Sequence, residues 1–127
     1  GLMYLTEKMT IKKGWQGSAA DQSSAMCGVF AGETRMPARR VVSYVEGSSD
    51  AGSPMGRASF RGHEFHYSDV VLDHITRFAY RLSRGEGIRD NLDGALVHNT
   101  LGSYTHLHPV ASTGMLRHFV GLCRQKR

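Results

Sequence analysis

The sequence predicts a strand-rich α/β fold with a helix at each end of the chain. Several short apolar segments follow one another between glycine-containing turns, as consecutive strands do. Apolar residues at helical spacing occur only near the two ends. A parallel α/β sheet needs a crossover helix between successive strands, and helices confined to the ends do not supply one. We therefore expect the chain to be the later half of a larger α/β domain.

The two predicted helices lie at residues 1–10 and 110–123. In the first, Leu2, Leu5 and Met9 fall near helical spacing, and neither a capping residue nor an initiating Met precedes them. We therefore expect this segment to begin inside a longer polypeptide. The second segment carries one apolar face, made by Val110, Met115, Leu116, Phe119, Val120 and Cys123.

The segments between the helices predict strands and turns. Residues 12–24 are polar and contain Gly and Ser, which favours a loop. Residues 68–77 fit either a short helix or a loop. Turns are predicted at 47–56, 85–87 and 93–94. The predicted strands are 26–30, 41–45, 58–67, 78–82, 95–98 and 102–107.

Length and composition indicate one soluble domain. The 127 residues suffice for a single core, and the hydrophobic content of 40% is ordinary for a globular protein. No apolar run approaches the roughly 20 residues that span a bilayer, so we expect a cytoplasmic protein without membrane contact. The net charge of +5 comes from dispersed basic residues without interleaved aromatics, which argues against nucleic acid as a partner.

The two cysteines, Cys27 and Cys123, lie far apart in the sequence and lack metal-ligand or redox spacing. Cys27 falls in a predicted buried strand and Cys123 on the last predicted helix. We expect both to be small apolar fillers in a reducing compartment.

Two histidine-bearing segments carry the chemistry. They are Gly-His-Glu-Phe-His-Tyr-Ser at 62–68 and Ser-Tyr-Thr-His-Leu-His at 103–108. Imidazoles move protons near neutral pH, so such segments suggest acid–base catalysis. Alternation along a strand places Glu64, His66 and Ser68 on one face, and likewise His106 and His108. A carboxylate and an imidazole on one face could orient a histidine across the sheet.

These segments resemble a known family. Together with Gly-Leu-Met-Tyr-Leu-Thr at 1–6 and Gly-Glu-Thr-Arg-Met at 32–36, they are similar to the C-terminal glutaminase domain of cobyrinic acid a,c-diamide synthases. The resemblance runs in order from Gly1 to about Pro109. It implies that the chain is the C-terminal portion, residues 1–127, of a class I glutamine amidotransferase-like (flavodoxin-like) domain.

The resemblance also implies a catalytic pair. In this family a cysteine on a strand-to-helix elbow attacks the glutamine amide, and a distant histidine is its base. The family's Tyr-x-His element corresponds to 104–106, so His106 is the expected general base and His108 the runner-up. The cysteine would lie about two positions before Gly1, so this fragment alone is expected to be inactive. His-Leu-His replaces the His-x-Glu of many class I enzymes, and Glu64 is a possible substitute for the orienting carboxylate.

Substrate contacts are expected at Arg35, His66 and Tyr104. Arg35 could pair with a carboxylate of glutamine or of a tetrapyrrole, or it could be a structural link to a neighbouring domain. The resemblance implies an upstream domain that binds ATP and magnesium, no cofactor or metal in this fragment, and a possible homodimer. The complete enzyme would use ammonia from glutamine to convert the a and c carboxylates of cobyrinic acid to amides, in cobalamin biosynthesis.

Other functions fit the sequence less well. A close relative amidates nickel-sirohydrochlorin in methanogens, and this fragment does not separate the two macrocycles. A histidine-based metal-binding module could use His63, His66, His106 and His108, but no Cys pair or His-Glu-x-x-His motif accompanies them. A nucleic-acid-binding domain is the third alternative, on the basic charge alone.

Overall fold

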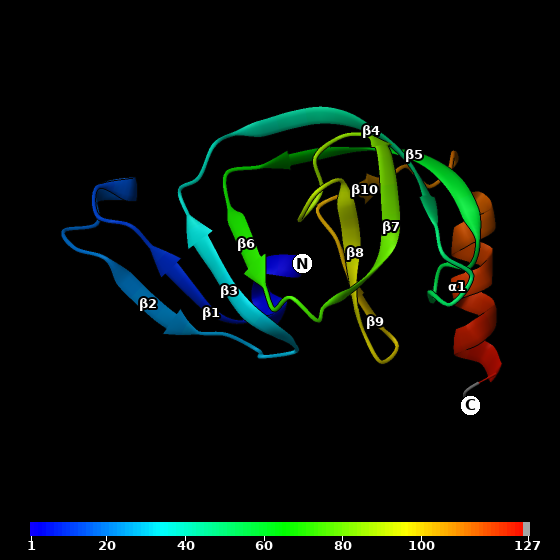
Figure 1. The fold of residues 1–127 in the computed structure, drawn as a ribbon, viewed down its shortest axis with the longest axis horizontal. Coiled ribbons are helices and arrows are strands. Elements are labelled where there is room, and N and C mark those ends of the chain that lie inside the picture. Colours follow the sequence, from blue (N-terminus) through cyan, green and yellow to red (C-terminus); the bar gives the residue numbers. More distant parts are fainter. Residues whose placement is uncertain (126–127) are drawn as a thin grey trace.

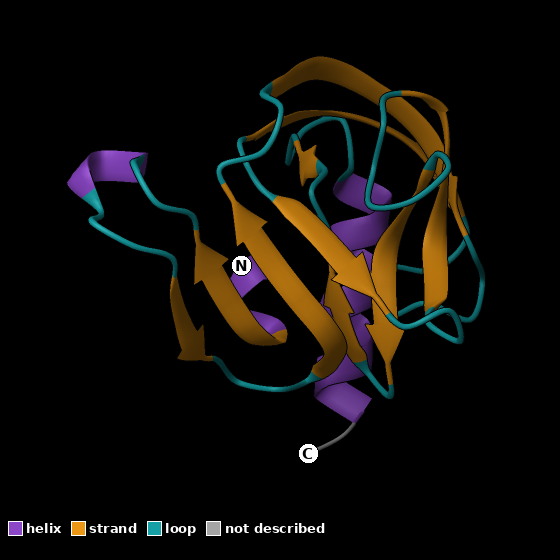
Figure 2. Cartoon of the chain, turned by 60° about the vertical axis from the view of Figure 1, so that its left-hand side comes forward, coloured by secondary structure: helices purple, strands orange, loops and turns teal. Residues whose placement is uncertain are grey.

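The computed structural model describes residues 1–125 and contains two β-sheets and one α-helix (Figures 1 and 2). The smaller sheet has the strand order β2 (Gln22–Ala25), β1 (Thr6–Ile11), β3 (Phe30–Met36) and β6 (Asp69–Leu72). The larger sheet has the order β10 (His106–Leu107), β5 (Ala58–His66), β4 (Val41–Ser49), β7 (Arg77–Arg84), β8 (Leu92–Val97) and β9 (Thr100–Gly102). Helix α1 (Thr113–Gln125) lies at the far end of the molecule from β1 and β2 (Figure 1).

Strand pairing is mostly antiparallel. Within residues 1–125 only β1 and β3 run parallel, and every pair in the larger sheet is antiparallel. The longest ladder joins β4 to β5, from Val41 opposite His66 to Ser49 opposite Ala58. Consecutive antiparallel strands, β4 with β5, β7 with β8 and β8 with β9, pair without a crossover helix between them.

The hydrophobic core has two parts. The first lies where the sheets meet and contains Leu2, Phe30, Val70, Leu72, Ala95 and Tyr104. The second lies under α1 and contains Val45, Phe60, Ala79, Tyr80, Leu82 and Met115. Met115 is the buried residue of α1, so it is the side chain that fixes this helix against the larger sheet.

Several predicted elements are confirmed. The strands expected at 41–45, 58–67 and 78–82 correspond to β4, β5 and β7, and the C-terminal helix corresponds to α1. The strand expected at 95–98 is the second half of β8. Among residues 1–125, no helix combines the length and the apolar character needed to cross a bilayer.

The N-terminal helix is much shorter than predicted. It is a single 3-10 turn, η1 (Leu2–Leu5), and β1 begins at Thr6. The fully buried Thr6 hydroxyl pairs with the Thr34 hydroxyl on β3 at 3.1 Å. Pairing with this distant strand overrides the helical spacing of Leu5 and Met9.

The strand predicted at 26–30 was wrong. Strand β2 ends at Ala25 and β3 begins at Phe30, so the predicted loop at 12–24 contains the start of β2 as well as η2 (Trp15–Gly17). Between the two strands the chain turns at Gly28, which has φ +68°. Cys27 lies in this turn. Both Cys27 and Cys123 are exposed, which contradicts the prediction that they fill the core.

Three further segments differ from expectation. Residues 68–77 contain a strand, β6, instead of a helix or only a loop. Asp93 and Gly94 lie inside β8 instead of forming a turn. The strand predicted at 102–107 is interrupted at residues 103–105, where the N–H groups of Tyr104 and Thr105 bond to Asp93 in place of a neighbouring strand.

Candidate functional site

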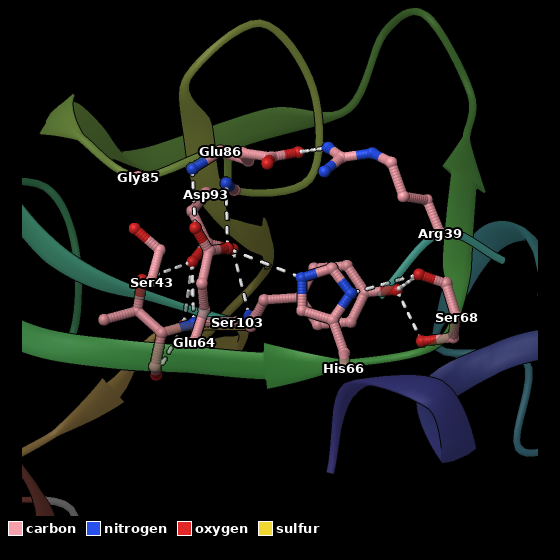
Figure 3. A network of polar contacts seen from close by, with 12 residues as sticks. Arg39, Ser43, Glu64, His66, Ser68, Gly85, Glu86, Asp93 and Ser103 are labelled. Atoms are coloured by element: carbon pink, nitrogen blue, oxygen red, sulfur yellow. Dashed lines mark hydrogen bonds and ion pairs between the residues drawn. The ribbon is translucent and has the colours of Figure 1, made fainter. Parts of the chain in front are cut away.

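A polar network lies on the inward face of β5 (Figure 3). Glu64 and Ser68 are buried and His66 is largely buried, whereas His63 and Phe65 are exposed. This is the alternation that an extended strand produces, and it confirms the predicted shared face of Glu64, His66 and Ser68. The larger sheet therefore presents a carboxylate and an imidazole to the interior from a single strand.

The Glu64 carboxylate receives backbone hydrogen bonds from the turn after β7. Its exposed fraction is 1%, and the N–H groups of Glu86 and Gly87 donate to it at 2.6 and 3.2 Å. Gly85 has φ +114°, and a Cβ there would lie 3.1 Å from Glu64 Oε1. The turn is therefore built from glycines that let its backbone approach a buried charge, which compensates the cost of removing that charge from water.

His66 is held on three sides. Its Nε2 lies 3.4 Å from Glu64 Oε2, and its Nδ1 lies 3.1 Å from the Ser68 carbonyl oxygen. Its ring stacks on the Tyr104 ring, with centroids 3.6 Å apart and planes 7° apart. Both ring nitrogens face acceptor oxygens, so a neutral ring donates to one of them and a doubly protonated ring donates to both.

Tyr104 closes the network from the segment before β10. Its hydroxyl lies 2.7 Å from Ser68 Oγ and donates to the Ser68 carbonyl at 3.1 Å. Burial raises the pKa of Tyr104 to about 12, although the hydrogen bond to Ser68 acts in the opposite direction. The phenol is therefore neutral at physiological pH, which fits its donation to the Ser68 carbonyl.

Asp93 on β8 is a second buried carboxylate, with an exposed fraction of 0%. Its Oδ1 accepts from the Tyr104 N–H at 3.1 Å. Its Oδ2 accepts from the Thr105 N–H at 2.9 Å, the Thr105 hydroxyl at 2.6 Å and the Ser103 hydroxyl at 3.2 Å. All four donors belong to the three residues that precede His106.

A cavity of about 360 Å³ adjoins the network. Arg39 and Glu86 form an ion pair beside it, and Figure 3 shows this pair extending past the His66 ring. The same pair raises the pKa of Arg39. The residues with polar side chains that face the cavity include Arg39, His66, Ser68, Glu86, Arg89 and Tyr104. A polar ligand could therefore reach the His66 and Tyr104 rings from solvent.

His106 and His108 are both exposed, and His106 lies on β10, which pairs with β5. In the ladder, His106 lies directly opposite His63, and their rings stack with centroids 5.1 Å apart. Directly opposed residues share a face of the sheet, so His106 lies on the face opposite Glu64. The sequence suggested Glu64 as the carboxylate that orients His106; in the structure the histidine that Glu64 contacts is His66.

The expected substrate residues are only partly brought together. His66 and Tyr104 are stacked and face one cavity, whereas Arg35 lies on β3 in the smaller sheet and is not part of that lining. Arg35 pairs with Glu33, which also contacts Lys8 at 3.2 Å. The hydrogen bond from Arg35, and then that from Lys8, lowers the pKa of Glu33. No cluster of three or more His, Cys, Asp or Glu suited to a metal ion occurs within residues 1–125.

The first turn of the chain packs against the segment that leads to His106. Leu2 and Tyr104 belong to one buried cluster. A Cβ on Gly102 would lie 2.7 Å from Phe30 Cε2 and 3.0 Å from Leu2 Cδ1, so only glycine permits this contact without displacement. The N-terminal turn and the 102–106 segment are therefore neighbours, although the sequence separates them by 100 residues.

Sequence reasoning missed three residues of the network: Arg39, Glu86 and Asp93. Glu86 belongs to a predicted Gly-Glu-Gly turn, so it lay beside a recognised sequence signal. Asp93 was expected in a turn, and no role was assigned to Arg39. Their roles depend on contacts between distant segments, for which a single sequence carries no local signal.

Comparison with known proteins identifies the family. Residues 1–113 match the CobB/CobQ-like glutamine amidotransferase domain. The chain belongs to this family. The fold class predicted from the sequence, a strand-rich α/β part of a class I, flavodoxin-like amidotransferase domain, agrees with that membership.

Curated relatives agree with the family match. The chain is 44% identical over 119 residues to the cobyrinate a,c-diamide synthase of Methanosarcina barkeri, and also 44% identical over 119 residues to that of Methanosarcina acetivorans. It is 37% identical over 112 residues to that of Halobacterium salinarum. These alignments cover 86–87% of the chain but only 24% of each relative. The chain thus spans about a quarter of the length of the relatives that it matches.

Proposed function

We propose that this chain supplies the general-base side of a glutaminase site, with His106 as the base. The supporting observation is the contact between the N-terminal turn and the 102–106 segment, made by Leu2, Gly102 and Tyr104. The family resemblance puts the nucleophilic cysteine about two positions before Gly1. A cysteine at that position would be close to Leu2 in the chain. Because Leu2 contacts the segment that leads to His106, the cysteine would also lie close to the strand that carries His106.

The proposed chemistry needs only one proton carrier from this chain. The His106 imidazole takes the proton of the cysteine thiol, because the thiolate and not the thiol attacks the glutamine amide carbon. The imidazolium then gives the proton to the departing ammonia, and a thioester of glutamate remains. Water, deprotonated by the same imidazole, hydrolyses the thioester and frees the thiol. His106 is exposed, so its ring nitrogens are open to a thiol contributed from outside the present chain.

For the complete protein we propose a glutamine-dependent amidoligase. The curated relatives are named cobyrinate a,c-diamide synthase, and ammonia from this site would amidate the a and c carboxylates of cobyrinic acid. ATP and magnesium would bind in a further domain outside residues 1–127 and activate the carboxylates. The alternative macrocycle is nickel-sirohydrochlorin, and rates measured with both macrocycles decide between them.

Glutamate release by the complete protein tests the proposed base. His106→Ala should lower this rate by about 10²–10⁴-fold, the usual contribution of a general base. His74→Ala is the matched control, since the His74 side chain is 91% exposed and its Nδ1 lies 2.8 Å from Asp73 Oδ1. Unchanged glutamate release in His106→Ala would contradict the proposal, and a selective loss in His108→Ala would transfer the role to that residue.

A further inference from the structure

We infer that Asp93 is a positioning residue that fixes the place of His106. This inference rests on the proposed role of His106 as the base. Strand β10 consists of only two residues, paired with Gly62 and His63 of β5. Two ladder pairs alone define the direction of a side chain poorly, so something else must hold the segment that leads into the strand.

The Asp93 carboxylate supplies that restraint. Residues 103–105 lie outside any strand, so the N–H groups of Tyr104 and Thr105 have no ladder partner. Buried backbone donors need acceptors, and both bond to Asp93, which is itself completely buried. The side-chain hydroxyls of Ser103 and Thr105 bond to the same carboxylate.

The geometry of the Asp93 carboxylate suits it to hold the segment that leads to His106. A carboxylate accepts on both oxygens, so it can receive donors on Oδ1 and Oδ2 at once. The residue after Thr105 is His106, so the last clamped N–H is one residue before the proposed base. A shift of this clamp would move the imidazole directly, and a misplacement of about 1 Å can cost about 100-fold in rate.

Asp93→Asn tests the inference in the complete protein. The variant replaces one acceptor oxygen by an NH₂ group, so at least one of the donors that face the carboxylate loses its acceptor. We expect kcat for glutamine hydrolysis to fall by about 10- to 100-fold with little change in KM, and ammonia-dependent amidation to persist. Asp50→Asn is the matched control, because Asp50 also accepts a backbone N–H, from Gly52 at 2.9 Å, but in the turn between β4 and β5.

Thr105→Val provides a second variant should Asp93→Asn fail to fold. It removes one hydroxyl bond to Asp93 and keeps the N–H bond and the side-chain shape. We expect a smaller loss of kcat, below about 10-fold, again confined to the glutamine-dependent reaction.

A double-mutant cycle separates positioning from general stability. If Asp93 acts through His106, then Asp93→Asn should change the residual rate of His106→Ala by less than about 2-fold. The inference would be overturned if Asp93→Asn lowered the glutamine-dependent rate by the same factor in the parent and in His106→Ala. It would also be overturned if Asp93→Asn lowered the ammonia-dependent rate as much as the glutamine-dependent rate. Full activity of Asp93→Asn beside an inactive His106→Ala would overturn the inference alone. Full activity of His106→Ala would overturn the proposed function and this inference together.

Discussion

Glu64 and His66 lie two residues apart on β5 and meet on its inward face, with Glu64 Oε2 3.4 Å from His66 Nε2. The carboxylate also accepts two N–H groups from the Gly85–Gly87 turn, so it joins that turn to the strand. The buried carboxylate therefore restrains both the backbone of that turn and the His66 ring.

Glu64→Gln should destabilise the chain. The amide keeps the shape of the side chain but turns one acceptor into a donor, which then faces a backbone N–H or His66. We expect the free energy of unfolding to fall by about 1–3 kcal/mol, measured by urea denaturation. Glu46→Gln is the control: its partner Arg61 lies 3.4 Å away and both side chains are well exposed, so a change below about 1 kcal/mol is expected. Equal effects of the two substitutions would mean that Glu64 does not organise the turn.

Gly62→Ala should disturb the strand that carries His106. A Cβ on Gly62 would lie 2.4 Å from the His106 carbonyl oxygen, which is too close for any carbon atom. We expect β10 to shift, with a loss of about 1–3 kcal/mol in the free energy of unfolding and a change in the His106 ring resonances by NMR.

Gly121→Ala provides the comparison for Gly62→Ala. Gly121 lies in α1, and no atom approaches its Cβ position within 4 Å. Alanine favours helix over glycine, so stability should rise by up to about 1 kcal/mol. If Gly62→Ala leaves both the stability and the His106 resonances unchanged, the close pairing of β5 with β10 is contradicted.

Tyr104 makes stability sensitive to alkaline pH. A tyrosine in an unfolded chain loses its proton near about pH 10, whereas the pKa of Tyr104 in the fold is about 12. Because the folded pKa is the higher one, the stability that this phenol contributes is complete below about pH 10 and is lost as the pH rises towards 12. Urea denaturation at a series of alkaline pH values should show this fall.

Tyr104→Phe should flatten the alkaline fall without removing it, because burial also raises the pKa of Tyr80. Tyr44→Phe is the control, since Tyr44 is 74% exposed. It should leave the pH profile unchanged. A Tyr104→Phe profile identical to that of the parent chain would refute the role assigned to burial.

The sequence predicted best those features that depend on local pattern. Alternation along β5 gave the shared face of Glu64, His66 and Ser68, and the helical face at 110–123 gave α1. The structure differs from the prediction where a residue far away in the sequence determines the local conformation. Thr6 pairs with Thr34 on β3 in place of continuing a helix, and the buried Asp93 collects donors from residues 103–105. Neither of these contacts between distant residues produces a pattern in the neighbouring sequence.

The position of His106 in the site also depends on a contact between distant segments. The family resemblance pointed to His106 as the expected base, and strand alternation predicted that His106 and His108 share a face. The sequence alone could not predict that Glu64 and His106 lie on opposite faces of the sheet, because their relative placement depends on the register between β5 and β10. A shift of one residue in that register would have placed the two side chains together.

The nitrogen-donor dependence of His106→Ala tests the central claim most directly. In the complete protein, amidation rates with glutamine and with free ammonia are compared for the parent, His106→Ala and His108→Ala. We predict that His106→Ala lowers the glutamine-dependent rate by about 10²–10⁴-fold and leaves the ammonia-dependent rate largely intact. Equal loss with both nitrogen donors would contradict the account, because His106 would then serve the fold or the ligase reaction instead of glutamine hydrolysis.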